Sequence, residues 1–215
     1  MLQWAETWQL KLSIDKCCVL HIGQYQTAST SVLSSLHSYT VCGHQLPVVT
    51  NCRDLGVIIA SNCQPRLHIN TIVAKASQHA NAILHCLQSR DPCVLLLAFK
   101  VYVRPILEFN TTVWSPVQKQ DIEAIENVQR RFTKRLYGLR DYSYFECLQK
   151  LNLQSLELRR IHYNLTLTYQ IVFGLTVLKC QEFFQWSGLS TTCSHRFKLM
   201  CYFANCVLWY GLINK

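Results

Sequence analysis

Apolar residues recur at three- and four-residue steps along much of the chain, most clearly between residues 121 and 140. Positions with this spacing share one face of an α-helix, so the pattern predicts an amphipathic helix over 121–140. Acidic residues stand near its start and basic residues near its end, the order that a helix dipole favours. Gly138 tolerates positive φ and is predicted to cap the C-terminus. The apolar positions of this stretch are Ile122, Ile125, Val128, Phe132 and Leu136.

The opposite side of this predicted helix is cationic. An i, i+4 pair of Glu126 and Arg130 would stabilise this helix by only about 0.2–0.5 kcal/mol. One such pair is too weak to account for so many uncompensated basic residues. We therefore predict contacts with phosphate groups rather than a merely solvated face. Five basic residues and no acidic residue lie between 130 and 140, namely Arg130, Arg131, Lys134, Arg135 and Arg140.

Similar periodicity predicts further helices after residue 62. Asp91 and Pro92 form a favourable helix start, because proline is tolerated in a first turn, and Pro105 ends or kinks the helix that follows. Ser155 is a predicted N-cap. Tyr102 and Trp114 are interpreted as core residues. The predicted helices span 68–88, 91–103, 121–140, 144–151 and 156–173, with a connector at 111–116.

The first sixty residues show shorter patterns bounded by turn-forming residues. They predict one helix and a few strands, so the fold class is mainly α with a small α/β N-terminal portion. The predicted elements are a helix at 1–12, a strand at 17–23, a loop at 24–38, a hairpin joining 39–41 to 48–49, and a strand at 54–59.

Composition limits the classes of function. Half of the 215 residues are hydrophobic and 15% are charged, which excludes wholesale disorder. The net charge of +9 favours a polyanionic partner such as nucleic acid. None of the twelve acidic residues adjoins another, whereas two-metal phosphoryl transfer needs clustered carboxylates. We therefore predict no catalytic residue, no metal site and no cofactor.

Twelve scattered cysteines without a C-x-x-C pair indicate reduced thiols. Glu6 and Lys11 interrupt any apolar signal segment, so we expect a cytoplasmic or nuclear protein that is not secreted. No apolar run reaches the roughly 20 residues that a bilayer span needs, so no membrane partner is expected. One possible zinc set fits no common spacing, and its thiols are interpreted as small buried hydrophobes. That set comprises Cys193, His195, Cys201 and Cys206.

Six segments in collinear order resemble the C-terminal part of non-LTR, LINE-type retrotransposon reverse transcriptases. The strings at 102–116 (YVRPILEFNTTVWSP), 125–139 (IENVQRRFTKRLYGL) and 151–165 (LNLQSLELRRIHYNL) resemble the region after the polymerase core. Residues 8–23 resemble the last palm motif, 52–59 the primer-grip hairpin, and 191–199 the tail. The resemblance implies a palm remnant with this hairpin at 1–62, a helical thumb-like domain at 63–178, and a degenerate tail at 179–215.

The resemblance also implies roles for particular residues. Leu55 and Gly56 correspond to the primer grip, with an ordinary hairpin turn as the equal alternative. The paired palm aspartates that hold Mg²⁺ in the family would precede Trp8, and Ser13-Ile14 replaces the family's Asn-Pro. We therefore expect a non-catalytic fragment that binds nucleic acid weakly and without sequence preference. The alternatives are a helical protein-interaction module, with its partner on the exposed palm remnant, and a translated relic without function.

Overall fold

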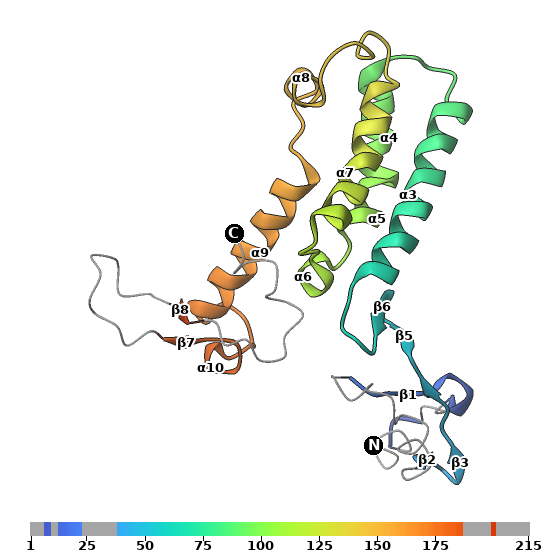
Figure 1. Cartoon of the computed structure of the whole chain (residues 1–215), viewed down its shortest axis with the longest axis vertical. Helices are drawn as coiled ribbons and strands as arrows, with labels where there is room; N and C mark the ends of the chain where they lie inside the picture. The colour runs from blue at the N-terminus through green and yellow to red at the C-terminus, as the bar shows by residue number, and fades with distance from the viewer. Residues whose placement is uncertain (1–6, 10–12, 23–37, 187–198, 201–215) are drawn as a thin grey trace. The chain divides into compact units, whose positions relative to one another are not determined.

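A computed structural model of the protein describes residues 7–9, 13–22, 38–186 and 199–200 (Figure 1). The chain divides into two compact units, Met1–Pro65 and Arg66–Lys215. Most described residues are helical, and the short strands lie mainly in the first unit, which confirms the predicted mixture. Among the described residues, no helix is both long and apolar enough to cross a membrane.

The first unit is built from paired short strands. β1 pairs in parallel with β4, β2 pairs with β3 and β5 pairs with β6, the last two in antiparallel register. The elements are a 3₁₀ helix η1 (Ile14–Lys16), β1 (Val19–Leu20), β2 (Thr40–Val41), β3 (His44–Gln45), β4 (Val48–Val49), β5 (Asn51–Asp54) and β6 (Val57–Ala60).

Two strand predictions in this unit were wrong. The hairpin after residue 39 closes at once through Cys42 and Gly43, both at positive φ, which leaves β4 to pair with β1 instead. The predicted strand at 54–59 is interrupted by Leu55 and Gly56, whose φ angles are 44° and 92°. Positive φ at both central positions is the geometry of a tight two-residue hairpin turn, so β5 and β6 form a hairpin. The predicted helix at 1–12 and the loop at 24–38 fall almost entirely outside the described residues.

The second unit is helical, and most predicted helices are confirmed. Asp91 caps α4, because its carboxylate accepts a hydrogen bond from the Cys93 N–H at 2.9 Å. Ser155 caps α9 in the same way, accepting from the Leu158 N–H at 3.2 Å. The helices are α3 (Arg66–Cys86), α4 (Pro92–Tyr102), α5 (Arg104–Glu108), α6 (Thr111–Trp114), α7 (Lys119–Lys134), α8 (Tyr144–Lys150), α9 (Leu156–Val172) and α10 (Cys180–Phe183); β7 (Gln185–Trp186) pairs with β8 (Leu199–Met200).

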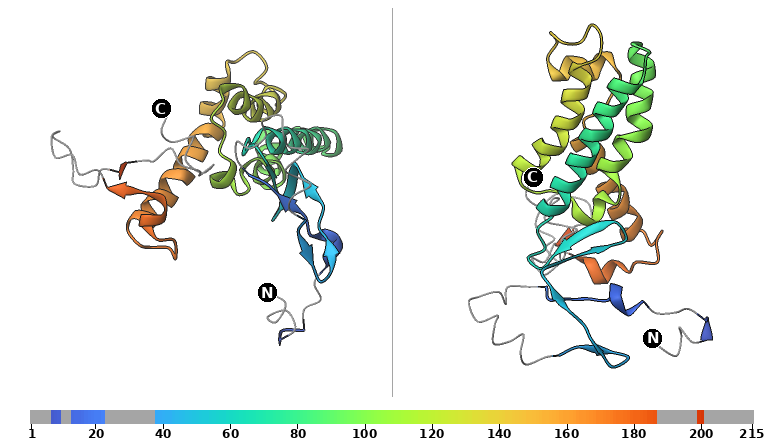
Figure 2. Two further views of the ribbon diagram at one scale, coloured as in Figure 1. Left: turned by 60° about the horizontal axis from the view of Figure 1, so that its bottom comes forward. Right: turned by 90° about the vertical axis from the view of Figure 1, so that its right-hand side faces the viewer.

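The core of this unit lies where α3, α4, α5 and α7 pack together (Figure 2). The rings of Phe99 and Phe132 stack with their centroids 4.6 Å apart. Trp114 is buried, and its indole N–H donates to the Phe109 carbonyl at 2.8 Å, so its prediction as a core residue is confirmed. Tyr102 is 63% exposed, and its prediction was wrong, because α4 turns its other face inward. The buried residues of α4 are Leu95, Leu96 and Phe99.

Candidate nucleic-acid interface

The central helix α7 is shorter at its C-terminus than the sequence pattern predicted. It ends at Lys134, and Arg135 is its C-cap, so Gly138 is not the capping residue. The chain leaves the helix there because buried Leu136 and Leu139 anchor a turn, in which the Leu139 N–H donates to the Leu136 carbonyl at 3.2 Å. Gly138 supplies the positive φ of 75° that this turn requires. The last basic residue, Arg140, therefore lies on a loop rather than on the helix.

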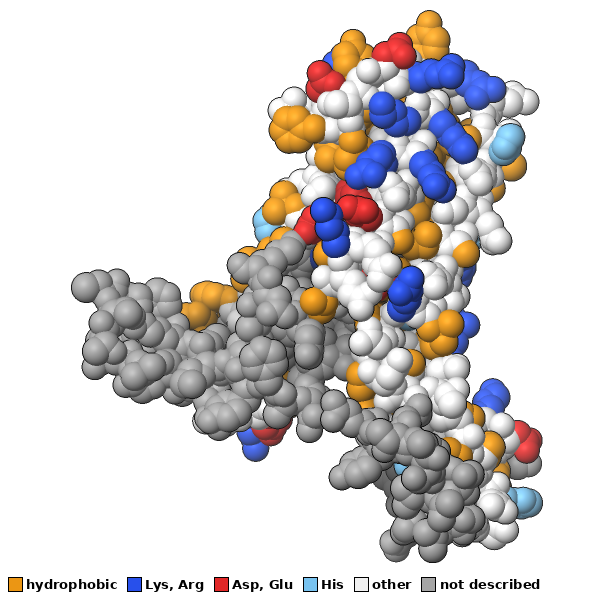
Figure 3. All heavy atoms as spheres, in the orientation of Figure 1, with side chains coloured by type: hydrophobic (Ala, Val, Ile, Leu, Met, Phe, Trp, Pro, Cys, Tyr) orange, Lys and Arg blue, Asp and Glu red, His pale blue; other side chains and the backbone are white. Residues whose placement is uncertain are grey.

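Two of the predicted basic residues line a shallow groove between α7 and α3. Arg131 on α7 and Arg135, the C-cap of that helix, line this groove, whose cavity volume is about 70 Å³. Arg135 donates from Nη1 to the side-chain oxygen of Asn81 on α3 at 2.6 Å. Lys and Arg side chains gather over α7 and the loop after it (Figure 3). The other lining residues are Ser77, Ala80, Leu84, Val128 and Phe132.

Two other predicted contact residues are engaged within the protein. The ammonium group of Lys134 donates to the carbonyls of Arg140 and Tyr142, so this half-buried lysine fastens the loop after α7. Arg130 donates to the Asn127 side chain at 2.6 Å and lies over the Tyr144 ring, 5.0 Å from its centroid. Phosphate contact by Lys134 would require breaking these hydrogen bonds.

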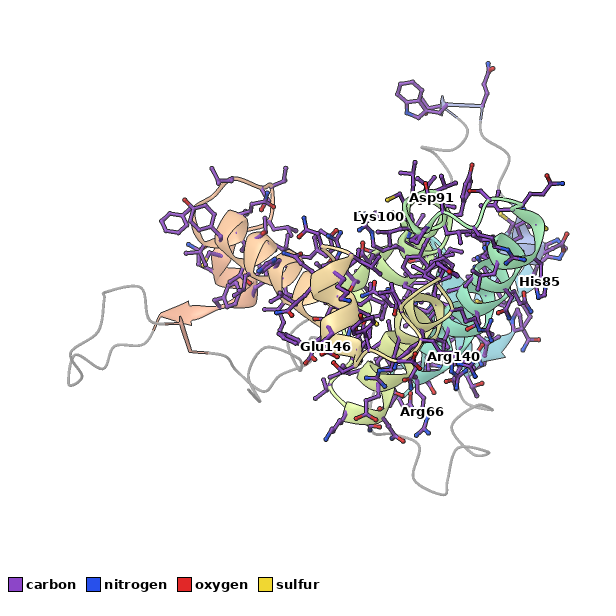
Figure 4. All side chains as sticks on the ribbon, turned by 90° about the horizontal axis from the view of Figure 1, so that it is seen from above. Arg66, His85, Asp91, Lys100, Arg140 and Glu146 are labelled. Carbon is purple, nitrogen blue, oxygen red and sulfur yellow. The ribbon has the colours of Figure 1, made fainter. Side chains whose placement is uncertain are left out.

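Arg140 completes the exposed basic set. Figure 4 shows that Arg140 and Lys100 lie on opposite sides of the helical unit. The side chains of Arg131 and Arg140 make no hydrogen bond or ion pair with the part of the chain that the structure describes, so both remain open to a ligand. We define the basic surface as Arg131, Arg135 and Arg140.

The expected ion pair between Glu126 and Arg130 is absent from the described residues. Glu126 is buried and accepts hydrogen bonds from the Tyr144 hydroxyl and from two backbone N–H groups at the start of α9. Burial, reinforced by the hydrogen bond to this carboxylate, raises the pKa of Tyr144 well above its usual range, so its hydroxyl stays protonated and donates. Glu126 therefore does not neutralise the basic surface.

The primer-grip-like residues belong to the other unit. Leu55 is 85% exposed at the tip of the β5–β6 hairpin, and Gly56 follows it. Both residues lie in the unit Met1–Pro65, whereas the basic surface lies in the unit Arg66–Lys215. Across the described ranges, no group of three or more histidine, cysteine, aspartate or glutamate residues has metal-binding geometry. The cysteine and histidine set between 193 and 206 lies outside those ranges.

Sequence reasoning missed two features of this region. Tyr137, between the basic residues Arg135 and Arg140, is 84% exposed. The signal was present, because the flanking leucines at 136 and 139 must turn inward if they are to be buried. Arg160 on α9 is almost completely buried, and burial lowers the pKa of its guanidinium. In the sequence, Arg160 is singled out only as part of the segment 151–165 that resembles the post-polymerase region.

Comparisons with known proteins give limited information about this arrangement. No family model matches the chain, and no solved structure matches it. A Caenorhabditis elegans protein described as uncharacterized is 23% identical over 124 residues. The match spans 56% of this chain and 63% of that relative, so less than two thirds of the relative is covered. Its description assigns no activity.

Proposed function

We propose that this protein binds nucleic acid without sequence preference through the basic surface of Arg131, Arg135 and Arg140. The observation that carries this proposal is the groove between α3 and α7, which Arg131 and Arg135 line. The acidic residue Glu126 of α7 does not neutralise these arginines, because it is buried against the start of α9. Guanidinium groups form paired hydrogen bonds with phosphate oxygens, which suits them to a polyanionic backbone. Such contacts fix position on the strand but carry no base information.

The resemblance to the C-terminal part of a non-LTR retrotransposon reverse transcriptase supports the same proposal. In this interpretation the β5–β6 turn at Leu55 and Gly56 is a primer-grip-like hairpin, and the helical unit is thumb-like. The tight two-residue turn is compatible with that role, and equally with an ordinary hairpin. We propose that the chain does not polymerise DNA, because no two of its acidic residues adjoin. Incorporation of nucleotides in a primer-extension assay with Mg²⁺ or Mn²⁺ would refute this part.

The binding proposal is tested by the salt dependence of affinity. Each neutralised phosphate contributes about 0.9 to the log–log salt slope on duplex DNA and about 0.7 on single strands. Arg131→Gln combined with Arg135→Gln should lower the slope by up to about 1.8 on a duplex. The matched control is Lys100→Gln with Lys179→Gln, which removes the same charge from α4 and from the N-cap residue of α10, outside the basic surface. Equal slopes in the two double variants would show that net charge alone attracts the ligand.

A second candidate function is a protein-interaction module, which the outer face of α4 favours. Several large apolar side chains there are exposed, and a helix that is apolar on all sides is ordinarily covered. Substituting Leu97→Glu would then abolish association with a protein partner while leaving nucleic-acid affinity unchanged. The exposed side chains of α4 are Val94, Leu97, Val101 and Tyr102. A relic without function would show neither kind of binding.

A further inference from the structure

Tyr137 is the most exposed aromatic side chain among the described residues whose exposure is known, at 84%. It stands in the turn after α7, two residues beyond Arg135 and three before Arg140. An exposed aromatic ring close in sequence to two exposed arginines is a combination found in surfaces that hold unpaired nucleic-acid strands. Charge draws in the backbone, and the ring offers a flat face to a base.

The turn that carries Tyr137 is held in place from both sides. Leu136 and Leu139 are buried, and a hydrogen bond joins their backbones. Lys134 fastens the next part of the loop by donating to the carbonyls of Arg140 and Tyr142. A ring presented by a fixed backbone loses little conformational freedom when a ligand packs on it, which favours binding.

Three other exposed aromatic residues in this unit lack this setting. Tyr169 and Phe173 on α9 pack against each other, with ring centroids 4.4 Å apart. The ring of Tyr142 is covered by the ammonium group of Lys150, 3.2 Å from its centroid. Isolated exposed aromatic residues are common and need no function. What distinguishes Tyr137 is the combination of exposure, a held turn and neighbouring cations that belong to the basic surface.

We infer that Tyr137 is a base-stacking residue and that the ligand of the basic surface is a single-stranded nucleic acid. This inference rests on the proposed function and deepens it. In a duplex, base faces are already stacked on their neighbours, so the ring gains nothing from them. In a single strand, any base can pack on the ring, and this stacking is tolerant of sequence because every base has a π face.

Anisotropy titrations of the full chain test this inference with three labelled probes: an oligothymidylate, an oligouridylate and a blunt-ended DNA duplex of two fully paired strands. Tyr137→Ala should weaken binding of the single strands about five- to hundredfold, and leave duplex binding unchanged. The salt slope should not change, because no charge is lost. Tyr137→Phe keeps the ring and should retain affinity. Tyr169→Ala, which removes an exposed ring of α9, is the control and should behave as the unsubstituted protein.

The outcomes separate the inference from the proposed function. If Tyr137→Ala keeps full single-strand affinity while the Arg131/Arg135 double variant loses it, the stacking role is refuted and the binding surface stands. If neither variant differs from the controls, both proposals fail. Equal loss on single strands and duplex would also refute stacking, since a duplex offers the ring no free base. Comparison of the two single-stranded probes shows whether the surface distinguishes RNA from DNA.

Discussion

The carboxylate of Glu126 on α7 accepts a hydrogen bond from the backbone N–H of Leu156, the first residue of α9, at 3.2 Å. Its other oxygen accepts from the N–H of Glu157 at 3.1 Å. The first N–H groups of a helix have no partner within that helix, and the helix dipole favours a negative charge beside them. Glu126 therefore supplies, from a different helix, part of the cap of α9.

Replacing this carboxylate should destabilise the helical unit strongly. In Glu126→Ala, two backbone donors and the Tyr144 hydroxyl lose a buried acceptor, so we expect the free energy of unfolding to fall by about 2–4 kcal/mol. Urea unfolding followed by circular dichroism measures the change. Glu123→Ala, which removes an exposed acid from the same helix, should cost less than about 0.5 kcal/mol. Similar effects of the two substitutions would contradict the capping role.

Replacing Arg160, in contrast to Glu126, should not lower the free energy of unfolding. Arg160 is 3% exposed, and neither of its terminal nitrogens has a hydrogen-bond partner among the residues that the structure describes. Burial lowers the pKa of Arg160, and the carboxylate of Glu126 opposes this shift most strongly. Arg160→Met removes a buried charge and keeps much of the volume, so unfolding free energy should stay constant or rise by up to about 2 kcal/mol. A clear loss of stability would mean that the guanidinium is held by interactions stronger than desolvation.

Local signals explain what the sequence predicts correctly. The helix-starting residues Asp91 and Ser155 bond to backbone groups only a few residues away, so their roles are visible in the sequence. Glu126 could not be assigned in this way, since its partners are 18, 30 and 31 residues distant in the sequence. The i, i+4 spacing instead suggested that Glu126 pairs with Arg130, a basic residue on the same helix. Long-range contacts decide which neighbour a buried charge meets, and periodicity does not contain them.

The candidate site, too, could be predicted from the sequence only in part. A helix extended to residue 140 would have placed Arg130, Arg131, Lys134 and Arg135 within about 140° of one another around its axis. The burial of Leu136 and Leu139 ends the helix early, and Lys134 is then used to hold the loop. Arg131 and Lys134 therefore have different roles in the structure, although their spacing in the sequence suggested the same role for both. The sequence predicts that this region is basic, but it does not predict which of its basic residues form the basic surface.

This inequality predicts separate effects for two similar substitutions. Lys134→Met removes two hydrogen bonds to backbone carbonyls, so it should lower the free energy of unfolding by about 1–3 kcal/mol. Arg131→Gln should change stability by less than about 0.5 kcal/mol, because its side chain is exposed. Thermal unfolding of the two variants measures the difference. If Arg131→Gln proves the more destabilising, Lys134 does not fasten the loop.

The start of α8 should be sensitive to acid. Ser143 and Glu146 form a capping box, in which the Glu146 carboxylate accepts from the Ser143 N–H at 2.7 Å. The hydrogen bonds with Ser143 lower the pKa of Glu146. The pKa of glutamate in an unfolded chain is about 4.3. The cap therefore contributes fully to stability above this pH, and its contribution is lost as the pH falls through the lower pKa of the folded state. An NMR titration of the Ser143 amide should follow this loss, and Glu146→Gln should remove the titration.

The strand unit should open more readily than the helices. Its described residues include only two buried side chains, Val57 and Ser61, and its strands pair only in twos. Two-stranded pairings with little buried apolar surface are marginal in water, and such regions open at low free energy. Amides of β5 and β6 should therefore exchange with deuterium well before those of α3 and α7, as measured by mass spectrometry of peptic fragments. Val57→Ala should speed exchange in the hairpin and leave α7 unchanged, because Val57 is the one buried apolar side chain of the hairpin. Uniform protection across both units would show that the strand unit gains stability from contacts beyond its own strands.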